Sequence, residues 1–141
     1  MLKQIVELPQ NYKPSEDEEY MNLFQLEYFR QKLLGWKDAL QKELMNAASY
    51  LKEENWNNPD FNDRAAVEAD AGLELRTKDR YRKLIAKIDD ALLRIENMEY
   101  GYCEETDKPI GLKRLEARPV ATLSIEAQEK HEKFERTHSE E

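Results

Sequence analysis

The segment 57–66 constrains the fold more than any other part of the chain, because it places a proline between two long segments rich in helix-forming residues. Pro59 has no backbone N–H and moves the preceding residue out of the α region, so a helix arriving from the N-terminal side must stop there. Asp60 and Asp63 belong to the residue types that cap the start of a helix. The sequence therefore predicts two antiparallel helices joined by a turn, with the tip at about 55–65.

Apolar residues recur at spacings of three and four on both sides of this turn, which is the pattern of a coiled coil. Only four glycines and few β-branched runs occur, and both facts disfavour an extensive sheet. The expected fold class is mainly α, with a long antiparallel coiled-coil hairpin, a small compact module and a C-terminal helix. The positions that form the two apolar stripes are Leu26, Phe29, Leu33, Trp36, Leu40, Leu44, Ala47 and Leu51, then Ala66, Ala69, Leu73, Tyr81, Leu84, Ile85, Ile88, Leu92 and Ile95.

The order of these parts predicts four segments. Near the start, Ser15 and Glu18 have the spacing of a capping box, which predicts a helix start there. Gly101 breaks the second helical pattern and favours a helix end. The predicted segments are 1–21, which packs on the compact module, 22–98, which forms the hairpin, 99–123, which forms the module, and 124–141, which forms a helix with a frayed tail.

The charge of the chain limits its partners. Its 22 basic and 30 acidic residues give a net charge of -8. A chain this acidic gains no counterion-release attraction for nucleic acid, so direct DNA binding is not expected, whereas a basic protein surface fits. The single cysteine excludes an internal disulfide, no signal peptide is visible, and no run reaches the ~20 apolar residues of a membrane span. We expect a cytoplasmic monomer with no membrane association.

Several runs, in this order and spacing, resemble the DksA family of bacterial transcription factors, which bind RNA polymerase directly. The resemblance covers roughly 15–135 and is far more specific than any one of its motifs. It implies a hairpin that enters the secondary channel of the polymerase. The runs that carry it are Asp60 to Ala66, Leu73 to Arg76, Asp79 with Arg80, Arg82 to Ile85, Gly101 to Cys103, and Arg114 to Pro119.

The chain departs from this family in the zinc module. DksA-like proteins usually carry two Cys-x-x-Cys pairs on one zinc ion, and the corresponding positions here are Cys103, Thr106, Ser124 and Ala127. Structural zinc needs four donors, usually thiolate or imidazole, so one thiol does not suffice. The resemblance therefore implies a zinc-independent member with a metal-free, zinc-ribbon-like module. The side chains expected to fill the space are Tyr102, Cys103, Leu112, Leu115, Leu123 and Ile125.

For the hairpin tip, the resemblance implies that Asp60, Asp63 and Ala65 lie near the polymerase active site. Ordinary helix capping also explains aspartates at a helix start, and the two roles are compatible.

On the second helix, Arg80 matches a family position that contacts the polymerase rim. Leu84, Lys87 and Arg118 match positions that line a site for the nucleotide ppGpp, shared with the polymerase, and Gln128 replaces a further basic residue of that site. Arg and Lys are the side chains that bind phosphate, so Gln128 is expected to weaken this site. A solvated helix face is the alternative explanation for the basic run.

The resemblance implies a regulator that works by binding, with no reaction of its own and with ppGpp as effector. Its output would be repression of ribosomal RNA promoters and activation of some amino-acid biosynthesis promoters. Two alternatives remain open. A carboxylate tip suits a Mg²⁺-dependent transcript-cleavage accessory similar to GreA, and a long hairpin also suits a coiled-coil adaptor without channel activity.

Overall fold

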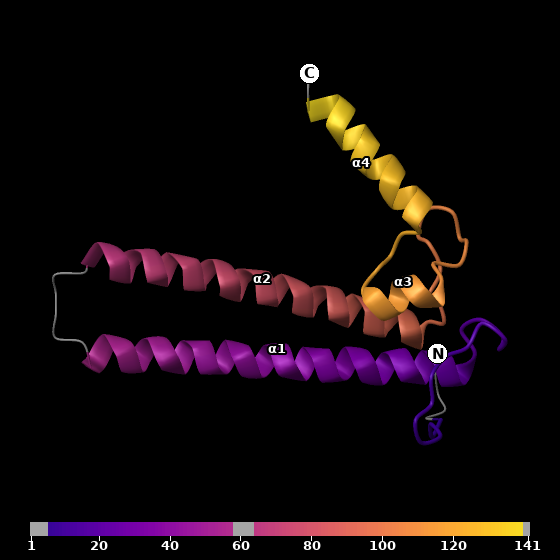
Figure 1. Cartoon of the computed structure of the whole chain (residues 1–141), viewed down its shortest axis with the longest axis horizontal. Helices are drawn as coiled ribbons and strands as arrows, with labels where there is room; N and C mark the ends of the chain where they lie inside the picture. The colour runs from indigo at the N-terminus through magenta and orange to yellow at the C-terminus, as the bar shows by residue number, and fades with distance from the viewer. Residues whose placement is uncertain (1–5, 58–63, 140–141) are drawn as a thin grey trace. The chain divides into compact units, whose positions relative to one another are not determined.

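The computed structural model describes the backbone of residues 6–57 and 64–139 and the side chains of 6–46 and 71–138 (Figure 1). Its helices are α1 (Leu23–Asn57), α2 (Arg64–Glu96), α3 (Leu112–Ala117) and α4 (Ile125–Ser139). Within those ranges no strand occurs, and the one isolated β-bridge joins Tyr102 to Pro109. The prediction of a mainly helical chain is confirmed.

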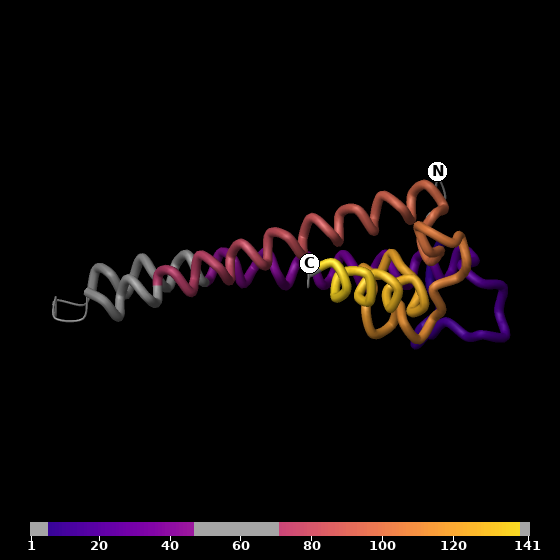
Figure 2. The backbone as a smooth tube through the Cα atoms, turned by 90° about the horizontal axis from the view of Figure 1, so that it is seen from above, coloured from indigo at the N-terminus to yellow at the C-terminus, as the bar shows by residue number. Residues whose placement is uncertain are grey.

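The chain forms two compact units. The terminal unit comprises Met1–Leu33 and Asp90–Glu141, and the central unit comprises Leu34–Asp89. The central unit holds the C-terminal part of α1 and the N-terminal part of α2, which run antiparallel and side by side (Figures 1 and 2). None of the helices in the described ranges is both long and apolar enough to cross a lipid bilayer.

In the central unit, the predicted apolar stripes are buried at Leu40 and Ile88, which are 7% and 0% exposed. An ion pair of 2.7 Å between Lys37 Nζ and Asp89 Oδ1 also links the two helices. Leu73, assigned to the stripe from its spacing, is 59% exposed. A pair of helices covers only a narrow stripe on each member, and Leu73 lies outside it.

The start of α1 differs from the sequence-based expectation. One bond of the capping box forms, because the Ser15 N–H donates to Glu18 Oε1 at 2.9 Å, but the Ser15 hydroxyl accepts from the Asp17 N–H instead of the Glu18 N–H, and only a turn follows. Met21 has a φ of 54°, in the left-handed region, which interrupts any helix passing through it. The helix begins instead at Leu23, where the Asn22 side chain accepts a hydrogen bond of 2.8 Å from the Gln25 N–H.

The core of the terminal unit brings α1, the end of α2 and α3 together. The Phe29 and Tyr100 rings lie 5.6 Å apart, and both side chains are buried. Lys32 Nζ donates to the Glu116 carboxylate at 2.6 Å and to the Glu116 carbonyl at 3.1 Å, which fixes α3 to α1. The other fully buried apolar side chains of this unit are Leu26, Leu33, Ile95, Cys103 and Leu115.

The loop after α2 is held by backbone hydrogen bonds. The helix ends at Glu96, and the Glu99 N–H then donates to the Arg94 carbonyl at 2.8 Å. The prediction that Gly101 ends the helix is therefore wrong, because Gly101 lies in the turn that follows the helix, with a φ of 92°. The Ile110 N–H donates to the Gly101 carbonyl at 2.8 Å, which closes the loop at its neck.

Candidate functional site

The predicted tip residues lie largely outside the described structure. Asp60 and Asp63 are not among the described residues, and Ala65 is described only as a backbone position in the first turn of α2. The helix ends on either side, at Asn57 and Arg64, bracket the tip.

A row of basic side chains runs along α2. Arg76, Arg80, Lys83 and Lys87 are separated by four, three and four residues, which places them on one helical face, and all four are exposed. Lys83 pairs with Asp79 at 3.1 Å. We call these four residues the basic face. A cationic surface of this kind suits carboxylates or phosphates of a partner.

The four predicted ppGpp positions are divided between the two units. Leu84 is half-buried and Lys87 is exposed on α2 of the central unit. Arg118 is exposed in the terminal unit, where its backbone N–H donates to the Arg114 carbonyl at 2.7 Å and closes α3. Gln128 lies on α4 and donates to Glu132 Oε1 at 3.3 Å. The structure thus describes Leu84 and Lys87 within the central unit and Arg118 and Gln128 within the terminal unit.

The four positions that correspond to zinc ligands have other roles here. Cys103 is 1% exposed and Ala127 is 2% exposed, so both pack in the core. The Ser124 hydroxyl accepts a hydrogen bond of 3.2 Å from the Ala127 N–H and so caps α4. The Thr106 hydroxyl accepts a bond of 3.4 Å from the Lys108 N–H within the turn. Three of these positions thus hold the local fold without a thiolate.

Hydrogen bonds to sulfur give Cys103 an acidic thiol. Burial raises the pKa of this thiol, but hydrogen bonds from the Thr106 side chain and from the backbone of Ser124 and Thr106 outweigh burial and lower the pKa to about 6. These donors stabilise negative charge on a single sulfur.

The donor set does not fit a structural zinc ion. Hydroxyl and methyl groups replace three of the four thiolates, and zinc is usually held by thiolate or imidazole. No group of three or more His, Cys, Asp or Glu side chains suited to a metal occurs in the part of the chain that the structure describes. His131 is hydrogen-bonded to the Glu105 carboxylate, which raises the pKa of the imidazole.

Two tyrosine hydroxyls that the sequence analysis did not single out tie the module together. The Tyr20 hydroxyl donates to the Gly101 carbonyl at 2.7 Å and accepts from the Gly111 N–H at 2.9 Å. The Tyr100 hydroxyl donates to the Pro119 carbonyl at 2.7 Å. Tyr20 is 81 positions from Gly101, so no local pattern signals the contact.

The expected filling of the module is right in part. Cys103, Leu112 and Leu115 are buried, as predicted, whereas Ile125 is 55% exposed. Ile125 is the first residue of α4, and Ala127, two positions later, is the residue of this helix that enters the core.

Two family models match the chain. The model described as "DnaK suppressor protein DksA, N-terminal domain" matches residues 25–95. The model described as "Prokaryotic dksA/traR C4-type zinc finger" matches residues 99–133, which include the four degenerate ligand positions. The second match therefore locates the module in the chain, although the donor set has changed.

Curated relatives extend the match over most of the chain. An RNA polymerase-binding transcription factor DksA from Caulobacter vibrioides (strain NA1000 / CB15N) is 60% identical over 128 residues, covering 91% of this chain and 90% of the relative. The protein of the same name from Escherichia coli (strain K12) is 45% identical over 115 residues, covering 82% of this chain and 76% of the relative.

A solved structure supports the fold. The structure of transcription factor DksA2 from Pseudomonas aeruginosa matches with a TM-score of 0.77 at 42% identity, covering 83% of this chain and 90% of that one. The matching family models, the identity to the curated relatives and the common fold together show that this chain belongs to the DksA family.

Proposed function

We propose that this chain binds bacterial RNA polymerase and regulates transcription. The observation that carries the proposal is the 60% identity, over 91% of the chain, to a relative named as an RNA polymerase-binding transcription factor. The relatives are transcription factors by name, and we assign the chain no reaction of its own and a place in the bacterial cytoplasm.

We further propose that the hairpin tip enters the secondary channel and places Asp60, Asp63 and Ala65 near the active site. The resemblance of the run from Asp60 to Ala66 supports this role. The hairpin is also long enough to reach into a channel, because the 33 residues of α2 span about 50 Å at about 1.5 Å per residue. Carboxylates near the active site would change the electrostatics around the catalytic metal and so the lifetime of promoter complexes.

The basic face of α2 supplies the contact that holds the hairpin at the channel entrance. We assign Arg80 to the polymerase rim, because its guanidinium is exposed and points from the same face as Lys87. We assign Leu84, Lys87 and Arg118, with Gln128 as a weaker contact, to a ppGpp site completed by the polymerase. ppGpp bound in this way favours the complex by its coupling free energy.

We also propose that the module at 99–123 folds without zinc. The Tyr20 and Tyr100 hydrogen bonds support this because they bind Gly101, Gly111 and Pro119 of the module without a metal, and the burial of Cys103 and Ala127 supports it because both side chains pack in the core. The segment 1–21 then packs on the module through Tyr20, while 22–98 and 124–141 form the hairpin and the C-terminal helix.

Equilibrium binding to purified RNA polymerase tests the proposal. Wild type is compared with Arg80→Ala and with Arg82→Ala, an exposed arginine of α2 outside the basic face. We expect wild type to bind, Arg80→Ala to bind about tenfold more weakly because a charge-assisted contact is lost, and Arg82→Ala to stay within about twofold. Equal losses in both variants would contradict the assigned face, and absence of wild-type binding would contradict the function.

A further inference from the structure

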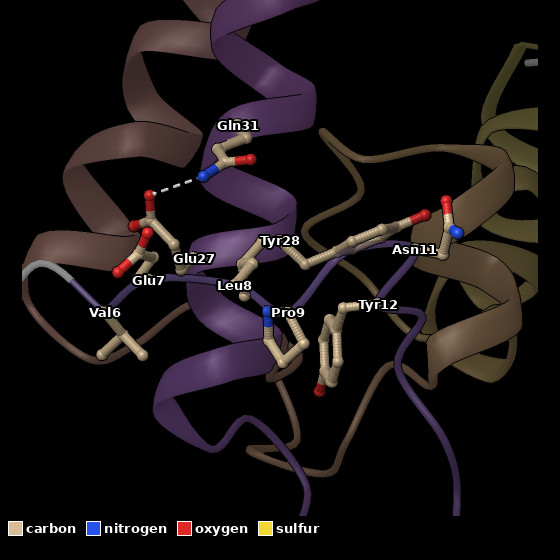
Figure 3. Close-up of a pocket in the computed structure, with 9 residues that line it drawn as sticks. All are labelled: Val6, Glu7, Leu8, Pro9, Asn11, Tyr12, Glu27, Tyr28 and Gln31. Carbon is tan, nitrogen blue, oxygen red and sulfur yellow. Dashed lines mark hydrogen bonds between the residues drawn. The ribbon is translucent and has the colours of Figure 1, made fainter.

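A pocket of about 710 Å³ lies in the terminal unit where the N-terminal segment passes the first turns of α1 (Figure 3). Its lining combines two carboxylates, two tyrosine rings, two amides and the apolar side chains of Val6, Leu8 and Pro9. None of the lining residues is Lys, Arg or His. The pocket is large enough to receive a side chain together with its neighbours from another molecule.

The two carboxylates of the lining, Glu7 and Glu27, differ in their partners. The side chain of Glu27 is 3% exposed, and its Oε1 accepts hydrogen bonds from Arg30 at 3.0 Å and from Gln31 at 3.1 Å. Within the described residues, its Oε2 has only a long contact of 3.4 Å to Arg30. Glu7 is exposed and forms no ion pair with any described side chain. Arg30 therefore compensates the charge of Glu27, whereas the carboxylate of Glu7 has no cation among the described side chains and can accept hydrogen bonds from a further donor.

The tyrosines contribute ring surface, because their hydroxyls are engaged outside the pocket. The Tyr12 hydroxyl donates to Glu18 at 2.9 Å, and the Tyr28 hydroxyl is hydrogen-bonded to Glu116. The Tyr12 and Tyr28 rings meet edge to face, with centroids 6.3 Å apart. Of the two lining rings, that of Tyr28 has Lys32 Nζ at 6.0 Å from its centroid, whereas the ring of Tyr12 has no cation over it among the described residues. Aromatic faces attract cations.

A pocket lined by both carboxylates and aromatic rings favours a cationic, planar ligand. A guanidinium is planar, always charged, donates to carboxylate oxygens in a fork and stacks on tyrosine. In Figure 3 the carboxylates of Glu7 and Glu27 are drawn at one end of the pocket and the ring of Tyr12 toward the other. The apolar part of the lining suits the methylene groups of the same side chain.

We propose that this pocket receives an arginine side chain of RNA polymerase, as a second contact independent of the hairpin. The inference rests on the proposed function and adds to it the residues through which the terminal unit engages the polymerase. The carboxylate of Glu7, which has no cation among the described side chains, lies on a lining without Lys, Arg or His, and this charge complementarity carries the inference.

Equilibrium binding to purified core polymerase tests this contact through Glu7, whose exposure makes its substitution harmless to folding. Wild type is compared with Glu7→Gln and Glu7→Lys, and Glu16→Lys is the matched control, an exposed acid of the same N-terminal segment outside the pocket lining. We expect binding about threefold weaker for Glu7→Gln, about tenfold or more weaker for Glu7→Lys, and within about twofold of wild type for Glu16→Lys. Circular dichroism checks that all variants remain helical.

The outcomes separate this contact from the proposed function. If wild type binds but Glu7→Lys and Glu16→Lys behave alike, the pocket contact is refuted and the proposed function stands. If wild type does not bind, both are refuted.

A second measurement follows the Tyr12 ring protons by NMR with N-acetylarginine amide or spermidine added. Shifts with the arginine probe that weaken in Glu7→Gln support the contact. Saturable binding of spermidine alone would assign the pocket to a small polyamine and overturn the proposal.

Discussion

Replacing Tyr20 by phenylalanine tests how the module is held without metal. The change keeps the ring, which meets the Tyr102 ring edge to face at 5.5 Å, and removes the hydroxyl that links Gly101 to Gly111. Each of the two lost hydrogen bonds contributes about 0.5–1.5 kcal/mol, so the free energy of unfolding should fall by about 1–3 kcal/mol. The Gly101 carbonyl retains a bond from Ile110, whereas the Gly111 N–H loses its partner, which favours the upper half of that range.

Urea unfolding followed by circular dichroism, with a zinc chelator present, measures this loss. The matched control is Tyr102→Phe, because the Tyr102 hydroxyl makes no hydrogen bond with the described residues, and its loss should change stability by less than about 0.5 kcal/mol. Wild type should unfold at the same urea concentration with chelator or with added zinc. If Tyr20→Phe matched Tyr102→Phe, or if chelation destabilised wild type, a hydrogen-bonded, metal-free module would be the wrong explanation.

Three further predictions concern glycines and a histidine. Gly101→Ala and Gly111→Ala both place Ala at a φ near 100°, which costs about 1–3 kcal/mol. Only Gly101→Ala adds a Cβ 2.7 Å from a methionine side chain, so in urea unfolding its free energy of unfolding should fall by a further ~1–3 kcal/mol compared with Gly111→Ala. Gly35→Ala should instead stabilise by up to about 1 kcal/mol, since this helical position is open to solvent, and a loss of stability would contradict the open site. The His131 pKa, followed by NMR, should lie above 6.5 in wild type and fall in Glu105→Gln, and an unchanged pKa in the variant would refute the pairing. Because pairing raises the folded-state pKa, the stabilisation by this pair is complete below pH 6.5 and is lost as the pH rises through the folded-state pKa.

The sequence predicted those features that follow from periodicity and local chemistry. The spacing of apolar residues and the proline near the tip predicted α1 and α2, and the burial of Leu40 and Ile88 confirms the seam. Local rules failed where side chains outside the motif decide the conformation. The Ser15 N–H donates to Glu18 as the capping box requires, yet the chain enters α1 only after the left-handed Met21, because the Met21 N–H is held by the buried Gln25 side chain.

The module shows the same limit. The loss of three thiolates is visible in the sequence, but what holds the module in their place is not, since Tyr20 acts across 81 positions. The pocket beside α1 is likewise assembled from residues far apart in the chain, such as Glu7 and Glu27, and no motif links them. The roles of Asp60, Asp63 and the ppGpp positions stay predictions from the family resemblance.

Transcription from a ribosomal RNA promoter by purified bacterial RNA polymerase, in the presence of a zinc chelator, tests the central claim most directly. The comparison is wild type against Asp63→Asn, with and without ppGpp, because Asn also caps helices and leaves the fold intact. The account predicts inhibition by wild type that deepens with ppGpp, and loss of inhibition in Asp63→Asn with polymerase binding retained. Equal behaviour of the two proteins would contradict it and would favour an adaptor whose tip has no activity.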